Sequence, residues 1–343
     1  AVATVVGVDH MVNSFRGSVQ DWLDYSLSAD AYVGTIEDAD SFEPGFARWL
    51  AGVPGVADVV RFRSMDLGGT GLRITGQDFI PEVQRSFRIL EGDPEPAWAP
   101  AAGGGGASAD ALPQALVSEP LARRLSLAPG DELELPTPAG PVAWRVAAVF
   151  QDYRADGGRL VTRLSTLQRY WTDGRLTSAG LYLAPGADLG AVSDAVSQRL
   201  QQQPGLRYGE TRNIRVESMK IFDQTFQLTQ SLKWLAALVA FVGMLGALLA
   251  LQLERRRETA LLWTLGLGRR ARAGLMLGES LALGLAAGLL SLPLGAGLAW
   301  MLTRLINQRA FGWTLEVRWQ EDAFALALVL SVAASLAASL VSA

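Results

Sequence analysis

Apolar positions near the C-terminal end of this chain form three long runs that are almost free of charge. The runs cover residues 234–253, 273–303 and 323–343. A helix of about 20 apolar residues crosses a bilayer core of roughly 30 Å at 1.5 Å per residue. Each run reaches that length, so we expect three transmembrane helices in this part of the chain.

The N-terminal residues follow a helical pattern of another kind. Residues 1–8 are apolar but too short to cross a membrane. Apolar residues then recur at helical spacing from Val12 to Leu27, with polar residues between them. We expect residues 1–28 to be the outer end of a truncated transmembrane helix that continues as an amphipathic stalk. Asp9 and His10 are expected to be an interfacial polar pair, and the alternative is a proton relay. Because both ends of the sequence lie in apolar runs, we expect a part of a larger membrane protein.

Residues 29–226 show short apolar segments separated by turn residues, which is typical of a mixed α/β domain. The segment 94–110, with three prolines and four consecutive glycines, predicts a surface loop. The expected strands are 31–35, 56–62, 72–75, 87–90, 132–135, 144–150, 160–162 and 179–183, and the expected helices are 42–50, 189–202 and 216–231. The segment 115–125 is expected to be a strand that leads into a helix. The predicted fold class is therefore membrane α-helical plus α+β, a helical transmembrane bundle with one large extracytoplasmic mixed α/β domain.

Charge predicts the orientation of the helices. The connection 254–272 holds six arginines against two acids, whereas the connection 304–322 holds three of each sign. Clustered arginines stay on the cytoplasmic side of a membrane. We therefore expect 254–272 inside, the domain 29–226 outside, and 304–322 as an external loop within a membrane domain that spans 227–343.

The connection 254–272 also carries the main candidate for chemistry. Its apolar side chains lie between basic flanks, so it can dock in a groove of a cytoplasmic partner with arginines around the rim. It can equally lie on lipid with its arginines on anionic headgroups. The candidate docking residues are Glu254, Arg255, Arg256, Arg257, Glu258, Leu261, Leu262, Trp263, Leu265, Gly266, Arg269 and Arg270.

Small residues in the second apolar run predict close helix packing. Gly284 and Gly288 form a GxxxG pattern, and Pro293 and Gly295 follow it. Small residues let helices approach closely in lipid, and Pro293 removes one backbone donor. The partner helix can belong to the same chain or to a second membrane protein of the same kind.

Several function classes are excluded by what the sequence lacks. A phosphate-binding loop needs a lysine after a glycine-rich turn, and neither Lys220 nor Lys233 follows one. The chain has no cysteine and one histidine, so thiolate or zinc sites and a Ser-His-Asp site are not expected. A net charge of -4 gives no basic field for nucleic acid. We expect no catalytic, cofactor or metal site in this chain.

These motifs together resemble one family. The segment 254–270, ERRRETALLWTLGLGRR, and the Glu279-led helix after it resemble the signature of FtsX-like ABC transporter permeases. Other pieces resemble the MacB-type periplasmic core domain and the second half of larger, duplicated permeases. These pieces are VPGV at 53–56, LEGD at 90–93, VSEPLARR at 117–124, LAPGD at 127–131 and, for the second half, RAFGWT at 309–314.

The resemblance implies a non-catalytic permease subunit in a bacterial cytoplasmic membrane. Its partners would be a cytoplasmic ABC ATPase that docks on 254–270, a second permease half or copy, membrane lipid and a periplasmic protein. It would couple the ATPase to motion of the periplasmic domain, for export or release of lipoprotein, peptide or other hydrophobic cargo. The alternative is a regulatory membrane protein whose outer domain activates a periplasmic partner such as a cell-wall hydrolase.

Overall fold

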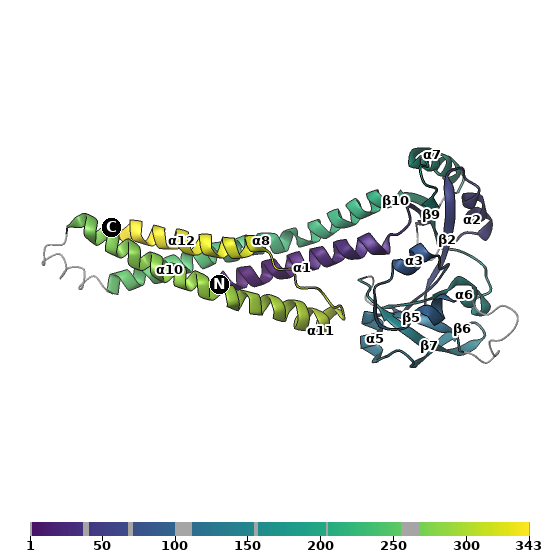
Figure 1. Cartoon of the computed structure of the whole chain (residues 1–343), viewed down its shortest axis with the longest axis horizontal. Helices are drawn as coiled ribbons and strands as arrows, with labels where there is room; N and C mark the ends of the chain where they lie inside the picture. The colour runs from purple at the N-terminus through teal and green to yellow at the C-terminus, as the bar shows by residue number, and fades with distance from the viewer. Residues whose placement is uncertain are drawn as a thin grey trace. The chain divides into compact units, whose positions relative to one another are not determined.

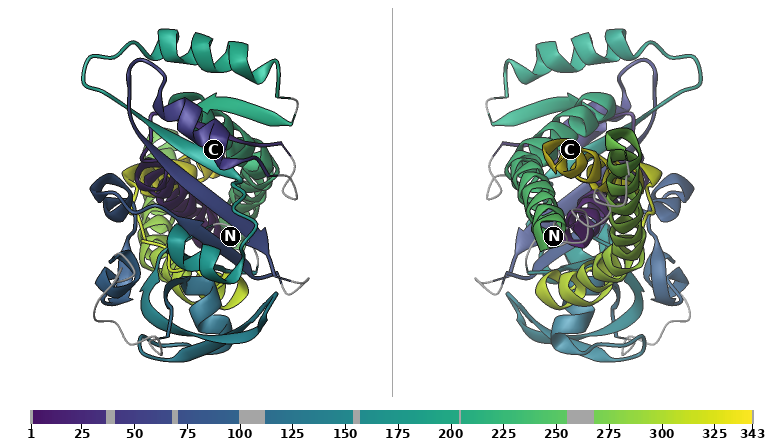
Figure 2. Two further views of the ribbon diagram at one scale, coloured as in Figure 1. Left: turned by 90° about the vertical axis from the view of Figure 1, so that its right-hand side faces the viewer. Right: turned by 90° about the vertical axis from the view of Figure 1, so that its left-hand side faces the viewer.

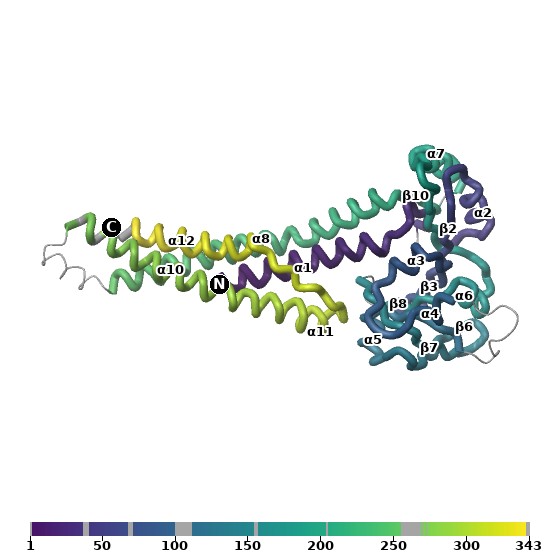
Figure 3. The backbone as a smooth tube through the Cα atoms, viewed as in Figure 1, coloured from purple at the N-terminus to yellow at the C-terminus, as the bar shows by residue number. Residues whose placement is uncertain are grey.

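The computed structural model describes residues 2–36, 41–67, 71–99, 112–153, 157–203, 205–254 and 268–342 (Figure 3). The chain divides into two compact units. The helical unit consists of Ala1–Ser18, Ile221–Ala310 and Thr314–Ala343. The sheet unit consists of Val19–Lys220 together with Phe311–Trp313.

The elements are labelled in Figure 1. The strands are β1 (Ala31–Thr35), β2 (Val56–Asp66), β3 (Arg73–Gln77), β4 (Ile89–Gly92), β5 (Gln114–Ser118), β6 (Glu132–Thr137), β7 (Gly140–Phe150), β8 (Arg159–Arg163), β9 (Ser178–Leu183) and β10 (Leu206–Glu210). The helices are α1 (Val2–Ser26), α2 (Pro44–Ala51), α3 (Pro81–Arg85), α4 (Glu95–Trp98), α5 (Glu119–Leu125), α6 (Leu164–Tyr170), α7 (Leu189–Leu200), α8 (Thr211–Glu254), α10 (Arg269–Trp300), the π-helix η1 (Met301–Ile306), α11 (Asn307–Phe311) and α12 (Glu321–Ser342).

Within the described residues, ten strands form one mixed sheet. Its order is β10-β1-β9-β2-β3-β8-β5-β7-β4, and β6 pairs with β7. The pairs β3–β8 and β5–β7 are parallel, and the others are antiparallel. Parallel neighbours need a crossover connection, and helices of this unit lie in those connections.

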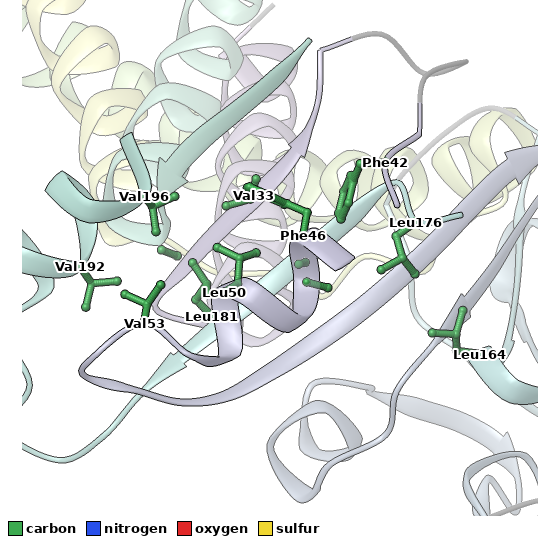
Figure 4. Packing of buried hydrophobic residues seen from close by; sticks show 13 residues of the cluster. Val33, Phe42, Phe46, Leu50, Val53, Leu164, Leu176, Leu181, Val192 and Val196 are labelled. Carbon is green, nitrogen blue, oxygen red and sulfur yellow. The ribbon is translucent and has the colours of Figure 1, made fainter. Parts of the chain in front are cut away.

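The first hydrophobic cluster shows why short helices form beside the sheet. Pro44 opens α2, where its missing N–H costs nothing. The buried face of α2 presents Phe46 and Leu50 to Leu181 of β9 and Val192 of α7 (Figure 4). The amphipathic pattern of α2 is therefore satisfied by packing on the sheet.

Two further clusters fill the other half of the sheet unit. One surrounds Trp144 of β7, which is fully buried, with Leu121 of α5 beside it. The other joins Phe79, Phe150 and Ala97 of α4. Burial of about 25 cal/mol for each Å² of apolar surface makes such clusters the main stabilising element of a domain.

The helical unit contains the apolar helices. Of the described residues, three helical stretches are long and apolar enough to cross a membrane: Thr211–Glu254, Ala273–Phe311 and Glu321–Leu340. An end-on view shows α1 among α8, α10 and α12 (Figure 2). The predicted fold class, a helical transmembrane bundle with a large mixed α/β domain, is confirmed by these elements.

Some local predictions need correction. Pro94 precedes a short helix, α4, inside the predicted loop 94–110, where Ala97 is buried in the third cluster. Residues 100–111 lie outside the described part. The sequence patterns also missed α3, α6 and β10, which are five to seven residues long. The helical backbone after α10 continues through η1 to Phe311, past the predicted helix end at 303.

Candidate functional site

Most of the predicted docking segment lies outside the described residues. Glu254 ends α8, Arg269 opens α10, and Arg270 is exposed. The residues that fall outside the described ranges are Arg255, Arg256, Arg257, Glu258, Leu261, Leu262, Trp263, Leu265 and Gly266. Their docking role stays a prediction.

The predicted packing glycines lie where helices approach each other closely. A Cβ atom built on Gly284 would overlap Ser335 of α12, and one on Gly288 would lie 3.1 Å from the Cβ of Ser331. Both serine hydroxyls donate to carbonyls of their own helix, at 2.8 Å. Satisfied hydroxyls and missing side chains let α10 and α12 touch. This arrangement favours the intramolecular interpretation over a dimer face.

The second half of the small-residue pattern meets α1. A Cβ on Gly295 would lie 2.7 Å from the Cβ of Val6, and one on Gly7 would lie 2.9 Å from the Cβ of Leu298. Pro293 lies inside α10. Its missing N–H removes one backbone hydrogen bond without ending the helix. Glycines on both partners therefore set the spacing of α1 and α10.

A buried ion pair joins α1 to α8 in the helical unit. The Lys233 ammonium lies 2.7 Å from the Asp9 carboxylate, and the two side chains are 14% and 8% exposed. The sequence indicated Asp9 and His10 as an interfacial polar pair, but the Asp9 carboxylate bonds to Lys233 instead. Nothing in the local pattern relates Asp9 to a residue so far along the chain.

His10 makes a separate set of contacts. Its Nδ1–H donates to the Val6 carbonyl at 2.9 Å, and its Nε2 accepts from the Gln320 N–H at 3.3 Å. One nitrogen donates and the other accepts, which is the pattern of a neutral imidazole. The ring also packs on Trp319 and Phe324. His10 thus holds the segment 314–320, which precedes α12, against α1.

The extended segment that precedes α12 continues along the same face of α1. The Arg318 N–H donates to Ser14 Oγ at 2.9 Å, and the Arg318 side chain covers Gly17. Leu315 of this segment is buried. His10, Ser14 and Gly17 are three or four residues apart, so they share one side of the helix. The sequence offered no signal for this contact, because an extended segment has no periodic pattern.

The pairing of α1 with α8 recurs further along both helices. In the helical unit, Arg16 binds Asp223 through two hydrogen bonds of 2.8 and 3.1 Å. In the sheet unit, Arg215 donates to the carbonyls of Asp24 and Leu27 at 3.0 and 3.1 Å. Side-chain pairs therefore link the two helices in each unit.

The contacts of these sites connect elements of the chain to one another. No group of three or more metal-ligating side chains occurs among the residues that the structure describes. The polar contacts join helices to each other, and the glycines bring helices close together. Among the described residues, these contacts connect the helices of the helical unit closely.

Three comparisons describe what the chain is similar to. Residues 231–343 match the model of the FtsX-like permease C-terminal family. The chain is 33% identical, over 99% of its length, to an uncharacterized ABC transporter permease protein of Mycobacterium tuberculosis, and it spans 40% of that relative's length.

Two solved structures are similar to the chain. One is the periplasmic region of MacB from Actinobacillus actinomycetemcomitans, with a TM-score of 0.39 and 12% identity over 55% of this chain and 94% of the other. The second is the extracellular domain of the ABC-type transporter YknZ from Gram-positive bacteria, with a TM-score of 0.33 and 12% identity over 53% and 100%.

Proposed function

We propose that this chain, which carries an FtsX-like permease domain at residues 231–343 and is a homologue of an ABC transporter permease, couples a separate cytoplasmic ATPase to motion of the sheet unit. The sheet unit would lie on the periplasmic side of the bacterial inner membrane. The motion would drive export or release of a lipoprotein, a peptide or another hydrophobic cargo.

The observation that carries this proposal is the continuity of α8. It runs unbroken from Thr211 in the sheet unit to Glu254. Glu254 begins the connection 254–272, called here the arginine-rich segment. At 1.5 Å per residue its 44 residues span about 66 Å, against about 30 Å for a bilayer core. A helix of that length can carry a displacement from one side of a membrane to the other without a hinge.

The helix α1 supports the same role. A single helix bends under load, whereas two helices joined by side-chain pairs resist bending together. The pairs Asp9–Lys233 and Arg16–Asp223 hold α1 to α8 in the helical unit, and Phe15 packs on Phe222 beside them. We therefore assign the transmission of movement to the α1–α8 pair.

The arginine-rich segment supplies the proposed docking site for the ATPase. Its apolar residues, Leu261, Leu262 and Leu265, would enter a groove, and the arginines on both sides would contact the groove's rim. The excess of arginine supports a cytoplasmic location for this segment. The ATP chemistry would then reside entirely in the partner.

The exposed side of α8 supports contact with lipid or with a second permease. Trp234, Leu235, Leu238, Val239 and Val242 are all more than half exposed. Their spacing places them on one apolar stripe of the helix. A second permease half or copy would cover part of this stripe, and lipid would cover the rest.

The docking proposal is tested with Leu262→Glu in the tagged full chain. The chain is purified in detergent from membranes of its source cells, and the ATP hydrolysis that co-purifies is measured. We expect Leu262→Glu to lose the ATPase, because a carboxylate in an apolar groove is desolvated without a partner. Leu125→Glu changes an exposed leucine of α5 and should retain it. Equal co-purification with both variants would refute the docking site.

A further inference from the structure

The sheet unit contains a cavity that the proposed transport role does not use. Its volume is about 200 Å³. It lies where the end of α1 meets β2, β3 and β7, and its lining includes Trp22, Tyr25, Phe62, Gln77 and Phe150. Sites for drug-sized ligands measure about 300–1,000 Å³. This cavity therefore matches a smaller group, about the size of one amino-acid residue.

The side chain of Gln77 is the feature that points to a ligand. Gln77 is only 3% exposed and lines the cavity at the end of β3. Among the described residues its amide has no hydrogen-bond partner, although its backbone pairs with its neighbours in the sheet. A buried amide without a partner is unfavourable. A ligand that offers both a donor and an acceptor would satisfy it.

Other polar groups of the lining differ in how they are satisfied. The hydroxyls of Ser64 and Thr75 bond to each other at 2.9 Å, and the Tyr25 hydroxyl donates to Gln151 at 3.2 Å. The Ser26 hydroxyl is buried and has no partner among the described residues. Gln77 and Ser26 are therefore among the groups that remain available to a ligand.

The cavity carries no net charge. Of the described residues that line it, only Arg159 is charged, and its Nε lies 2.9 Å from the Asp152 carboxylate. Burial raises the pKa of the Tyr25 hydroxyl, so this group stays neutral at ordinary pH. A charged ligand would lose its hydration without gaining a free counter-charge. The electrostatics therefore favour a neutral ligand.

Aromatic rings provide the apolar part of the lining. Trp22, Phe62, Phe87 and Phe150 all face the same space, and the Arg159 guanidinium lies 5.2 Å from the Phe150 ring centre. Rings of this kind bury an aliphatic or aromatic side chain well. The lining thus combines aromatic rings with polar groups, among them the unpaired amide of Gln77.

We propose that this cavity binds an uncharged, amide-bearing apolar group of the size of a single blocked amino acid. The Gln77 amide would donate to the carbonyl and accept from the N–H of the ligand amide, and the rings would enclose its side chain. Two sources share this chemistry, a residue of a peptide chain and a free small amide. Because α1 and Ile214 of α8 both contribute to the lining, the ligand would contact both helices.

The test measures binding of N-acetyl-L-leucinamide to the full chain in detergent by ligand-observed NMR. A ligand of this size is expected to bind with a Kd on the order of 0.1–10 mM. N-acetyl-L-leucine, which carries a carboxylate, should bind at least about tenfold more weakly. Protein-free micelles give the background signal from partition into detergent.

Two variants separate the site from a structural role. Gln77→Met keeps the volume and removes the amide, so binding should weaken about tenfold while Tm stays the same or rises. Gln198→Met, at an exposed position of α7, should change neither. No binding to the wild-type chain, equal binding to the Gln77→Met variant, or a lower Tm for that variant would each overturn the proposal.

A blocked tripeptide with leucine at its centre distinguishes the two sources. Tighter binding of the tripeptide than of N-acetyl-L-leucinamide would support a peptide ligand. Binding of the single blocked amino acid alone would support a free small amide.

Discussion

The buried pair of Asp9 and Lys233 gives the sharpest prediction about the helical unit. Lys233→Met removes the ammonium and keeps a side chain of similar length. It leaves the Asp9 carboxylate, 8% exposed, without its cation. Since Asp9 is short, its carboxylate cannot extend to water as a lysine can. We expect the variant to be clearly less stable than the wild-type chain.

The size of the effect follows from the burial of the pair. Breaking a buried ion pair by removing one partner costs about 3–5 kcal/mol. The entropy of unfolding is about 2.1 cal/mol/K per residue, or about 0.7 kcal/mol/K for 343 residues. If the chain unfolds as one unit, Tm falls by about 4–7 °C. The Asp9→Asn, Lys233→Met double variant removes both charges and should recover most of that loss.

The assay is thermal unfolding of the purified chain in detergent, followed by tryptophan fluorescence. The control is Asp223→Asn, which breaks the Arg16–Asp223 pair, whose side chains are 46% and 49% exposed. An exposed pair contributes about 1 kcal/mol or less, so its Tm should fall by less than about 1.5 °C. An unchanged Tm for Lys233→Met, or a double variant no more stable than this single one, would refute the reasoning.

Other predictions concern the packing and ionisation of each unit. Replacing Gly284 and Gly288 by Leu should lower Tm in detergent by several degrees, because α12 leaves no space for the new side chains. The control Gly243→Leu should leave Tm unchanged, because a Cβ atom there meets nothing within 4 Å. Burial raises the pKa of Tyr182 above its ordinary value of 10. Its contribution to stability is therefore complete below pH 10 and is lost as pH rises further, and Tyr182→Phe should reduce the alkaline fall in Tm. Leu50→Ala, in a fully buried position of α2, should lower the free energy of unfolding by about 2–5 kcal/mol. Its Tm should therefore fall below that of the control Leu125→Ala, which changes an exposed leucine.

Local patterns in the sequence predicted the long apolar helices and the strands with one buried face, because each side of such an element has the same surroundings along its length. The apolar runs became α8, α10 and α12, since a helix in lipid needs only length and hydrophobicity. Alternation of polar and apolar residues predicted the strand β6, whose Leu135 belongs to the second hydrophobic cluster and whose Leu133 packs against it. Short elements such as β10 had too few residues to show a period.

Such patterns could not predict contacts between residues that are far apart in the sequence. The partner of Asp9 is 224 positions away, and the cavity around Gln77 is assembled from strands and helices spread from Trp22 to Ile214. Residue spacing describes one element at a time, whereas these sites depend on which elements pack together. Gly284 and Gly288 of α10 were found by spacing, but only the packing identified α12 as the helix that they face.

The proposed coupling requires one membrane topology, with the arginine-rich segment inside and the sheet unit outside. The chain has no cysteine, so single-cysteine variants can be labelled without background. Intact cells that express Leu125→Cys or Arg256→Cys are treated with a membrane-impermeant maleimide. We predict that the Leu125→Cys variant is labelled and that the Arg256→Cys variant is labelled only after the membrane is permeabilised. Labelling of Arg256→Cys from outside intact cells would contradict the proposed coupling.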